Sequence, residues 1–220
     1  MILIKNLKPT PIKNSTREGE KMAHIECDSF DVVNSSADIF TAHLTLDPAI
    51  KDTIIKTIKD SGDKQNRKTN VKADMTNWNM QEESGFRELE QEIASVIKYI
   101  PSITRPNDHS DHPMEIKTMW GLCYKKNDYT DVHDHWPSIW SGTFYLDIPT
   151  DYAGTLFFPE LEYDIEPVTG QLVIFRGATL HGVKTIQSNS DRIAISFNYS
   201  SRVMLPDPLM TLIKHNENGV

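Results

Sequence analysis

The chain has 220 residues, enough for one large domain, and 38% of them are hydrophobic while 25% are charged. These fractions are ordinary for folded globular proteins, so a sizeable core can form. The formal net charge is −8, which disfavours nucleic acid as the main ligand because a phosphate backbone binds basic surfaces.

Cysteine usage and hydropathy indicate a cytoplasmic protein. Cys27 and Cys123 are the only cysteines, and they form neither a CxxC motif nor a disulfide framework, which fits a reducing compartment. The first residues, MILIKNLKPTP, have too short an apolar run for a signal peptide, and no segment approaches the ~20 apolar residues that span a bilayer. We therefore expect a protein without a membrane partner.

The N-terminal half is predicted to form an arm followed by two helices. Residues 1–37 are polar and weakly patterned, so we expect an arm or short edge strands laid on the body. Asp47 and Pro48 are residue types preferred at the N-cap and the first helical position, and an amphipathic pattern of isoleucines follows them. A second amphipathic helix is predicted over residues 85–100, where Pro101 stops it.

The C-terminal half changes to a strand pattern. Six short β-type runs are separated by turn residues: EIKTMWGLCY, SGTFYLDI, GTLFF, QLVIF, HGVKTI and DRIAISFNY. The absence of a helical pattern between them indicates an antiparallel sandwich or barrel. We predict a mostly β jelly roll with two supporting α-helices in the N-terminal half. The single domain comprises an arm (1–37), helical support (38–114), the jelly-roll core (115–201) and a tail (202–220).

The segment YTDVHDHWPSIW, residues 129–140, carries the first candidate metal ligands. In an extended strand, side chains two residues apart point to the same side, so His133 and His135 project together with Asp131. Two imidazoles need a third ligand from another strand, and His181 at the start of HGVKTI is the candidate. The alternative is an exposed, acid-flanked strand end that binds no metal.

The last strand has one polar and one apolar face. Arg192, Ala194, Ser196 and Asn198 share one face, and Ile193, Ile195, Phe197 and Tyr199 share the other. In one arrangement the apolar face lies under the helices and Arg192 lines the barrel interior. In the other, the apolar face fills the core and Arg192 meets water. The strand taken without its surroundings favours this second arrangement.

Together, these elements resemble the 2-oxoglutarate/Fe(II) oxygenase superfamily. After His133 and His135 the chain continues with SGTFYL, GTLFF, PVTGQLVIFRGATLHGV and RIAISFNYS, in the order of the core strands of prolyl-hydroxylase-like enzymes. The resemblance runs from about Trp120 to Ser201 and is closest to an oxygenase group found in bacteria and in phages of marine cyanobacteria. It implies a double-stranded β-helix, in the cytoplasm of a bacterium or of the host of a phage.

The resemblance also implies an Fe(II) site. The superfamily usually holds iron with a His-x-Asp/Glu…His triad, but the middle position here is His135. A carboxylate ligand balances part of the Fe(II) charge, and a neutral imidazole does not. We expect His133, His135 and His181 as the metal ligands. Recruitment of Asp131 from the same face, or water beside two histidines, is the alternative.

The same resemblance implies 2-oxoglutarate as co-substrate. Arg192 matches the arginine that anchors its distal carboxylate, a group that a rigid guanidinium fork binds bidentately. Ser196 on the same face adds a hydroxyl, and Tyr124 is near the place where related enzymes put a phenol. The expected reaction is hydroxylation of a small-molecule or peptide substrate with release of succinate and CO₂. Trp136 and Trp140 either form a substrate wall or serve the core.

Two functions of other classes compete with the oxygenase. One is a jelly-roll binding or structural module with a vestigial metal site, which has no need of Arg192 together with His133 and His181. The other is a cupin-type metal enzyme that does not use 2-oxoglutarate. Such an enzyme would use three histidines naturally, but it leaves Arg192 unexplained.

Overall fold

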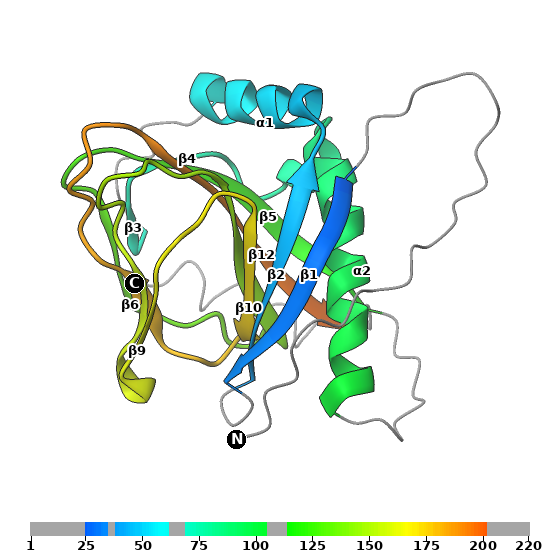
Figure 1. Ribbon diagram of the computed structural model, residues 1–220. Coiled ribbons are helices and arrows are strands. Elements are labelled where there is room, and N and C mark those ends of the chain that lie inside the picture. The colour runs from blue at the N-terminus through cyan, green and yellow to red at the C-terminus, as the bar shows by residue number, and fades with distance from the viewer. Residues whose placement is uncertain (1–24, 35–37, 62–68, 105–113, 202–220) are drawn as a thin grey trace, which may run out of the picture.

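The computed structural model describes residues 25–34, 38–61, 69–104 and 114–201 as two antiparallel β-sheets and two helices (Figure 1). The larger sheet joins seven strands in the order β1 (Ile25–Asn34), β2 (Ile39–Leu46), β10 (Gln171–Arg176), β7 (Trp140–Asp147), β12 (Arg192–Ser201), β5 (Met114–Tyr124) and β4 (Asp74–Met75). The smaller sheet joins five, in the order β3 (Val71–Lys72), β6 (Tyr129–His133), β11 (His181–Val183), β8 (Leu156–Phe158) and β9 (Tyr163–Ile165). The predicted jelly roll with two helices is confirmed.

Helix α1 (Pro48–Ser61) begins where the sequence predicts it. The side chain of Asp47 accepts a hydrogen bond of 2.8 Å from the backbone N–H of Ala49, which satisfies one of the free donors of the first turn. None of the described helices is long and apolar enough to cross a membrane. Figure 1 shows α1 lying across one end of the barrel.

Helix α2 (Phe86–Thr104) is longer than predicted, because it continues past Pro101. The expectation that this proline ends the helix is wrong. The fixed φ angle of proline is compatible with an α-helix, so a final turn can still form although the hydrogen bond of its missing N–H is lost. In Figure 1, α2 runs along the side of the larger sheet that faces away from the smaller sheet.

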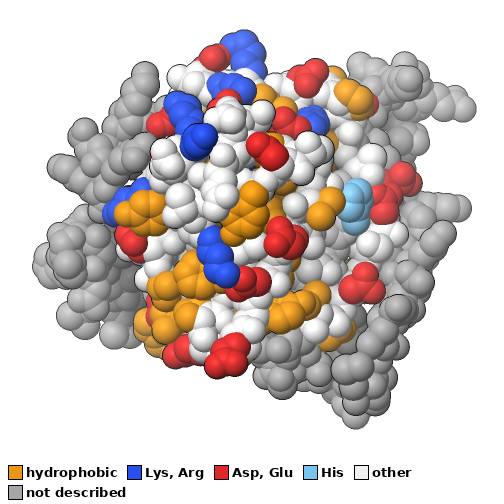
Figure 2. All heavy atoms as spheres, turned by 60° about the vertical axis from the view of Figure 1, so that its left-hand side comes forward, with side chains coloured by type: hydrophobic (Ala, Val, Ile, Leu, Met, Phe, Trp, Pro, Cys, Tyr) orange, Lys and Arg blue, Asp and Glu red, His pale blue; other side chains and the backbone are white. Residues whose placement is uncertain are grey.

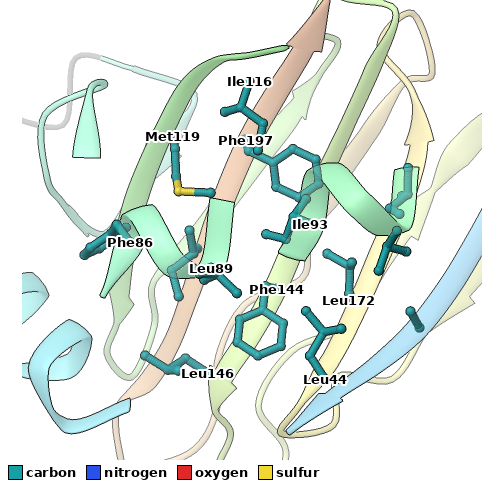
Figure 3. Close-up of a cluster of buried hydrophobic side chains, with 14 of the residues drawn as sticks. Leu44, Phe86, Leu89, Ile93, Ile116, Met119, Phe144, Leu146, Leu172 and Phe197 are labelled. Carbon is teal, nitrogen blue, oxygen red and sulfur yellow. The ribbon is translucent and has the colours of Figure 1, made fainter. Parts of the chain in front are cut away.

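The first hydrophobic core lies between the helices and the larger sheet. Figure 3 shows Leu89 and Ile93 of α2 among Phe144, Leu172 and Phe197 of the strands. The apolar face of β12 belongs to this core: Ile193, Ile195, Phe197 and Tyr199. The apolar face therefore lies under the helices, and the arrangement favoured by the isolated strand is wrong. Helices that bury an apolar face must cover a sheet, and this is the surface they cover.

A second core fills the space between the two sheets. It contains Trp120, Leu122 and Tyr124 of β5, together with Tyr145 of β7 and Phe175 of β10. The outer face of the smaller sheet meets water, and Figure 2 shows apolar, acidic and basic side chains interspersed on that side of the molecule. The site described below lies at the inner face of the same sheet.

Several strands differ from the predictions. Residues 25–34, expected in an arm or short edge strand, form the long edge strand β1, and residues 39–46 form β2 within a segment expected to be helical support. The acidic residues 159–166, where no strand is predicted, contain a 3₁₀ turn (Pro159–Leu161) and the short strand β9. Strand β11 ends at Val183, earlier than the run HGVKTI suggests.

Candidate functional site

Three histidines converge between the sheets. His133 ends β6, His181 begins β11, and the two residues are directly paired in the antiparallel ladder. His135 lies beyond the end of β6, so it does not continue the strand, yet its ring turns toward the other two. The ring centroids of His133 and His181 lie 4.4 Å apart, and those of His135 lie 4.9 Å and 5.0 Å from them.

The geometry of these rings suits a single cation. One nitrogen of each ring lies within 4.8 Å of the others. Imidazole nitrogens bind transition metals at ~2.0–2.2 Å, so a small closing movement brings all three onto one ion. Hence the sequence-predicted set His133, His135 and His181 is assembled in space, whereas Asp131 is not part of it. The Asp131 carboxylate lies 3.4 Å from the ammonium of Lys72 instead.

Backbone carbonyls orient two of the rings. Nδ1 of His133 lies 2.8 Å from the carbonyl oxygen of Asp131, and Nδ1 of His181 lies 2.9 Å from that of Thr179. A proton on each Nδ1 is donated to the carbonyl, which leaves the Nε2 lone pair free for a cation. Burial lowers the pKa of His133, and burial with the nearby His133 lowers the pKa of His181 to about 3. Both rings are therefore neutral at neutral pH, the state that binds metals.

His135 is positioned by its backbone. Its N–H donates to the carbonyl of Gly177 at 2.7 Å, and its carbonyl accepts from the N–H of Ser138 at 2.8 Å. A Cβ on Gly177 would lie 2.1 Å from the carbonyl oxygen of Ser138, so only glycine allows this close approach. Burial lowers the pKa of His135 well below its usual value, and the two other imidazoles lower it further.

Arg192 is fully buried without a counter-charge. Its side chain is 1% exposed, and its Nη1 donates to the carbonyl oxygens of Ala153 and Gly154 at 3.1 Å and 3.0 Å. The guanidinium carbon lies 5.0 Å from the ring of Tyr124 and 5.2 Å from that of Tyr145. Its Nε has no hydrogen-bond partner, and no carboxylate of the described residues lies within ion-pair distance.

Two tyrosines beside Arg192 differ in their hydroxyl groups. The hydroxyl of Tyr124 forms a 2.8 Å hydrogen bond with that of Thr130, whereas the buried hydroxyl of Tyr145 lies near the guanidinium of Arg192 and has no acceptor among the described residues. Burial raises the pKa of Tyr145 to about 12, so it remains a neutral donor. Tyr124 is thus where the sequence analysis expects it, but its hydroxyl is already engaged. Tyr145 is the phenol with a free hydroxyl.

One cavity contains both groups. Its polar lining is Tyr124, Thr130, His133, His135, Thr143, His181, Arg192 and Ser196. Aliphatic and aromatic side chains and one glycine form most of the rest, and no aspartate or glutamate of the described residues lines it. With a divalent cation on the histidines, the cavity would hold two cationic ends and no protein anion.

The two candidate substrate-wall tryptophans lie in different places. Trp136 is 75% exposed and directly follows His135. Trp140 is 5% exposed and belongs to the core beneath the helices, where its ring lies 5.8 Å from that of Phe40 and 4.0 Å below the guanidinium of Arg176. Trp140 therefore lies outside the cavity lining, in the structural position that the sequence analysis held as the alternative.

Sequence reasoning missed two residues near the site: Trp120, which lines the cavity, and Tyr145, which lies beside Arg192. Both occur in strands that it predicted, and the alternation of β5 and β7 places them on the same side as Tyr124. What distinguishes them is that each has a buried polar atom without a partner. That property appears only when the sheets are assembled.

Comparison with known proteins identifies the fold. No protein-family model matches the chain, and no curated protein matches its sequence. A prolyl-4-hydroxylase from Pseudomonas putida matches with a TM-score of 0.56 and 13% identity, over 77% of this chain and 95% of its own. The viral collagen prolyl hydroxylase of Paramecium Bursaria Chlorella virus-1, in a 2-oxoglutarate complex, has a TM-score of 0.54 and 16% identity, over 69% and 89%.

A third structure shares the fold but is not a prolyl hydroxylase by name. HygX from Streptomyces hygroscopicus, with nickel, 2-oxoglutarate and hygromycin B bound, matches with a TM-score of 0.54 and 11% identity, over 76% of this chain and 84% of its own. At such identities the matches establish the fold. The chain has the double-stranded β-helix found in 2-oxoglutarate/Fe(II) oxygenases, including prolyl hydroxylases, as the resemblance implies.

Proposed function

We propose that the protein is a metal- and 2-oxoglutarate-dependent oxygenase that hydroxylates a small-molecule or peptide substrate. The observation that carries the proposal is the buried Arg192, which has no anionic partner in the described part of the chain and shares one cavity with three convergent neutral imidazoles. An unpaired buried charge is costly, so a protein retains one where a ligand supplies the opposite charge.

The histidines fit the metal that the proposal requires. Imidazole nitrogen is a good ligand for Fe(II), and the hydrogen bonds from Nδ1 hold the rings of His133 and His181 in the correct tautomer. When bound, Fe(II) and 2-oxoglutarate activate dioxygen and couple release of succinate and CO₂ to oxidation of the substrate. The three rings would hold the ion, and the sheets on either side would exclude water from it.

The other end of the cavity fits a carboxylate. Nε of Arg192 and the hydroxyl of Tyr145 are buried donors without acceptors, and a carboxylate accepts from both. Ser196 lies on the same face of β12 and lines the same cavity, so its hydroxyl is a further donor. These groups would orient 2-oxoglutarate by its distal carboxylate and so direct its other end toward the histidines.

A second candidate function has one observation in its favour. The triad lacks the carboxylate ligand usual in 2-oxoglutarate oxygenases, and a cupin-type metal enzyme without 2-oxoglutarate would use three histidines. That function gives no role to Arg192 or to the free hydroxyl of Tyr145. A non-catalytic module leaves the whole cavity without a role.

Thermal unfolding of the full, metal-stripped chain tests the proposal. We expect Ni(II) with 2-oxoglutarate, or with its inert analogue N-oxalylglycine, to stabilise the protein by roughly 2.7 kcal/mol at a hundredfold excess over Kd. His181→Ala should abolish the response to both. Arg192→Met should keep the response to the metal and lose that to 2-oxoglutarate, and Arg192→Lys should fall between because it keeps the charge but not the planar fork.

The alternatives predict other results in the same assay. Stabilisation by metal alone, with no effect of 2-oxoglutarate, would support the cupin-type enzyme, and no response to either would support the non-catalytic module. With Fe(II) and air, succinate should accumulate from 2-oxoglutarate in the wild type but not in Arg192→Met. Failure to form succinate despite binding would refute the catalytic part of the proposal.

A further inference from the structure

The indole of Trp120 lies in the cavity wall with an unused donor. Trp120 is 2% exposed, lines the cavity from β5, and its Nε1–H has no acceptor among the described residues. Buried indole N–H groups usually find a partner, because leaving a buried donor unpaired costs about 1–3 kcal/mol. The missing acceptor is therefore expected to belong to a molecule that enters the cavity.

Trp120 lies at the histidine end of the cavity. Its ring centroid is 5.9 Å from that of His135, and it is paired across the sheet with Ser196. Arg192 is paired with Tyr124, four residues further along the same strand pair. At about 3.3 Å per residue, the two positions on β5 are roughly 13 Å apart along the backbone. The indole therefore serves a different part of a ligand from the part that Arg192 serves.

The charge at this end favours an anionic acceptor. The three imidazoles are neutral ligands, so a divalent cation bound there would keep its full charge. No carboxylate of the described residues lines the cavity, and the exposed Asp131 is paired with Lys72. An entering carboxylate would meet the cation and the indole N–H together.

We propose that the N–H of Trp120 donates to a carboxylate held at the histidine end of the cavity, and that this contact determines which ligands the site accepts. The inference rests on the proposed function. The carboxylate belongs either to the 2-oxo acid, next to its keto group, or to the substrate. In both cases it supplies the negative charge that His135, as an imidazole, does not.

The NMR signal of the indole N–H proton of Trp120 can detect this hydrogen bond directly. The chain has four tryptophans, so the full protein labelled with ¹⁵N-tryptophan and loaded with diamagnetic Zn(II) gives four indole signals. Trp120→Phe identifies one of them, and if that variant does not fold, removing Trp78, Trp136 and Trp140 singly assigns it by elimination. We expect 2-oxoglutarate to move the Trp120 proton downfield by on the order of 1 ppm, as a charge-assisted hydrogen bond does.

The two sources of the carboxylate give different spectra. If it belongs to the 2-oxo acid, 2-oxoglutarate alone moves the signal. If it belongs to the substrate, the signal stays in place with N-oxalylglycine and moves when formate or acetate is added, but not with acetamide. A signal that none of these ligands moves, in a protein shown by calorimetry to bind Zn(II) and 2-oxoglutarate, overturns the inference alone. Absence of any 2-oxoglutarate binding overturns the proposed function with it.

Calorimetry adds a matched pair of variants. Trp120→Phe keeps an aromatic ring but loses the N–H, and we expect it to bind the responsive carboxylate roughly tenfold or more weakly. Trp78→Phe is the control, because its ring contacts that of Trp120 at 4.7 Å yet is 40% exposed and outside the cavity lining. Equal weakening in both variants would assign the effect to packing and contradict the inference.

A charge variant tests the role of the third ligand. His135→Asp would place a negative charge at the histidine end, so we expect it to retain Zn(II) and to bind the same carboxylate more weakly, by on the order of tenfold. Unchanged affinity in a variant that still binds Zn(II) would contradict the assignment of the acceptor as an anion.

Discussion

Cys123 neighbours Tyr124 on β5 but faces the opposite side of the sheet, into the core beneath the helices, where it is 4% exposed. Burial raises the pKa of its thiol from 9.0 to about 11, and the negative charge of Asp191 adds to the shift. Between these values the unfolded chain releases the proton and the folded chain keeps it. The native state is therefore stabilised fully below about pH 9 and progressively less as the pH rises toward 11.

Urea unfolding should show this dependence at the level of one residue. We expect the stability difference between wild type and Cys123→Ala to change by on the order of 2 kcal/mol between about pH 8 and about pH 10.5, with the wild type losing more. Other buried groups that titrate in this range cancel in the difference. A difference that does not vary with pH would show that the thiol does not contribute.

For single residues, the sequence predicts those positions that follow from spacing along the chain. His133, His135 and His181 meet as predicted, although His135 lies beyond the end of β6 and not on an extended strand with His133. Arg192 faces the cavity because its strand alternates. The sequence does not single out Tyr145, because the burial of its hydroxyl without an acceptor is apparent only in the folded structure. The prediction that Asp131 shares a face with His133 is wrong, because a register shift in the β6–β11 pairing puts Thr130 and His133 on the cavity side and leaves Asp131 exposed beside Lys72.

Among the elements, α1 and β5 are in unusually close contact. A Cβ on Gly121 would lie 2.3 Å from Cγ1 of Ile58, so only glycine lets the helix approach the strand that carries Trp120 and Tyr124. We expect Gly121→Ala to destabilise the protein by ~1–3 kcal/mol, as overpacking of a core does. The double variant with Ile58→Ala should recover part of that loss relative to Ile58→Ala alone. Additive free energies of unfolding would contradict a direct clash.

Helices and long strands were predictable because their hydrophobic periods are clear, and three shortfalls have local causes. The sequence analysis assigns the residues of β2 to the helical support, because the amphipathic pattern of the helix that follows is stronger than the strand pattern before it. Strand β9 has only three residues within an acidic segment, too short for an alternation to stand out. Helix α2 continues past Pro101 because the fixed φ angle of proline is compatible with a helical backbone.

Over the whole molecule, the two sheets differ in how they are supported. The larger sheet has hydrophobic core on both faces, whereas the smaller sheet has short strands, three of them with three residues, and one solvent-facing side. Local opening is expected to be easier where fewer apolar contacts hold the backbone. The candidate metal ligands all come from the smaller sheet or the loop that follows β6.

Hydrogen exchange measured by mass spectrometry should detect the consequence. In the metal-free protein we expect faster exchange in peptides from β6 and β11 than in those from β7 and β12. Zn(II) with 2-oxoglutarate should slow exchange chiefly in β6 and β11, because one ion would link both strands. His181→Ala should show no such slowing. If the added Zn(II) and 2-oxoglutarate slowed exchange equally throughout the chain, or nowhere, the result would contradict a cation bound by these two strands.

The two carbonyls that bind the guanidinium of Arg192 help to fix the distance between the arginine end and the histidine end of the cavity. The residues that supply them lie between β7 and β8, and Gly154 adopts a φ of +73° that side-chain-bearing residues rarely take. At the other end, His133 and His181 are fixed by the pairing of their strands. Arg192 and the histidine pair each belong to a sheet strand, which limits movement of the two ends toward each other. Under the proposed function, the cavity would therefore select 2-oxo diacids by length. It would accept the five-carbon 2-oxoglutarate and bind shorter or longer homologues with the same chemical groups more weakly.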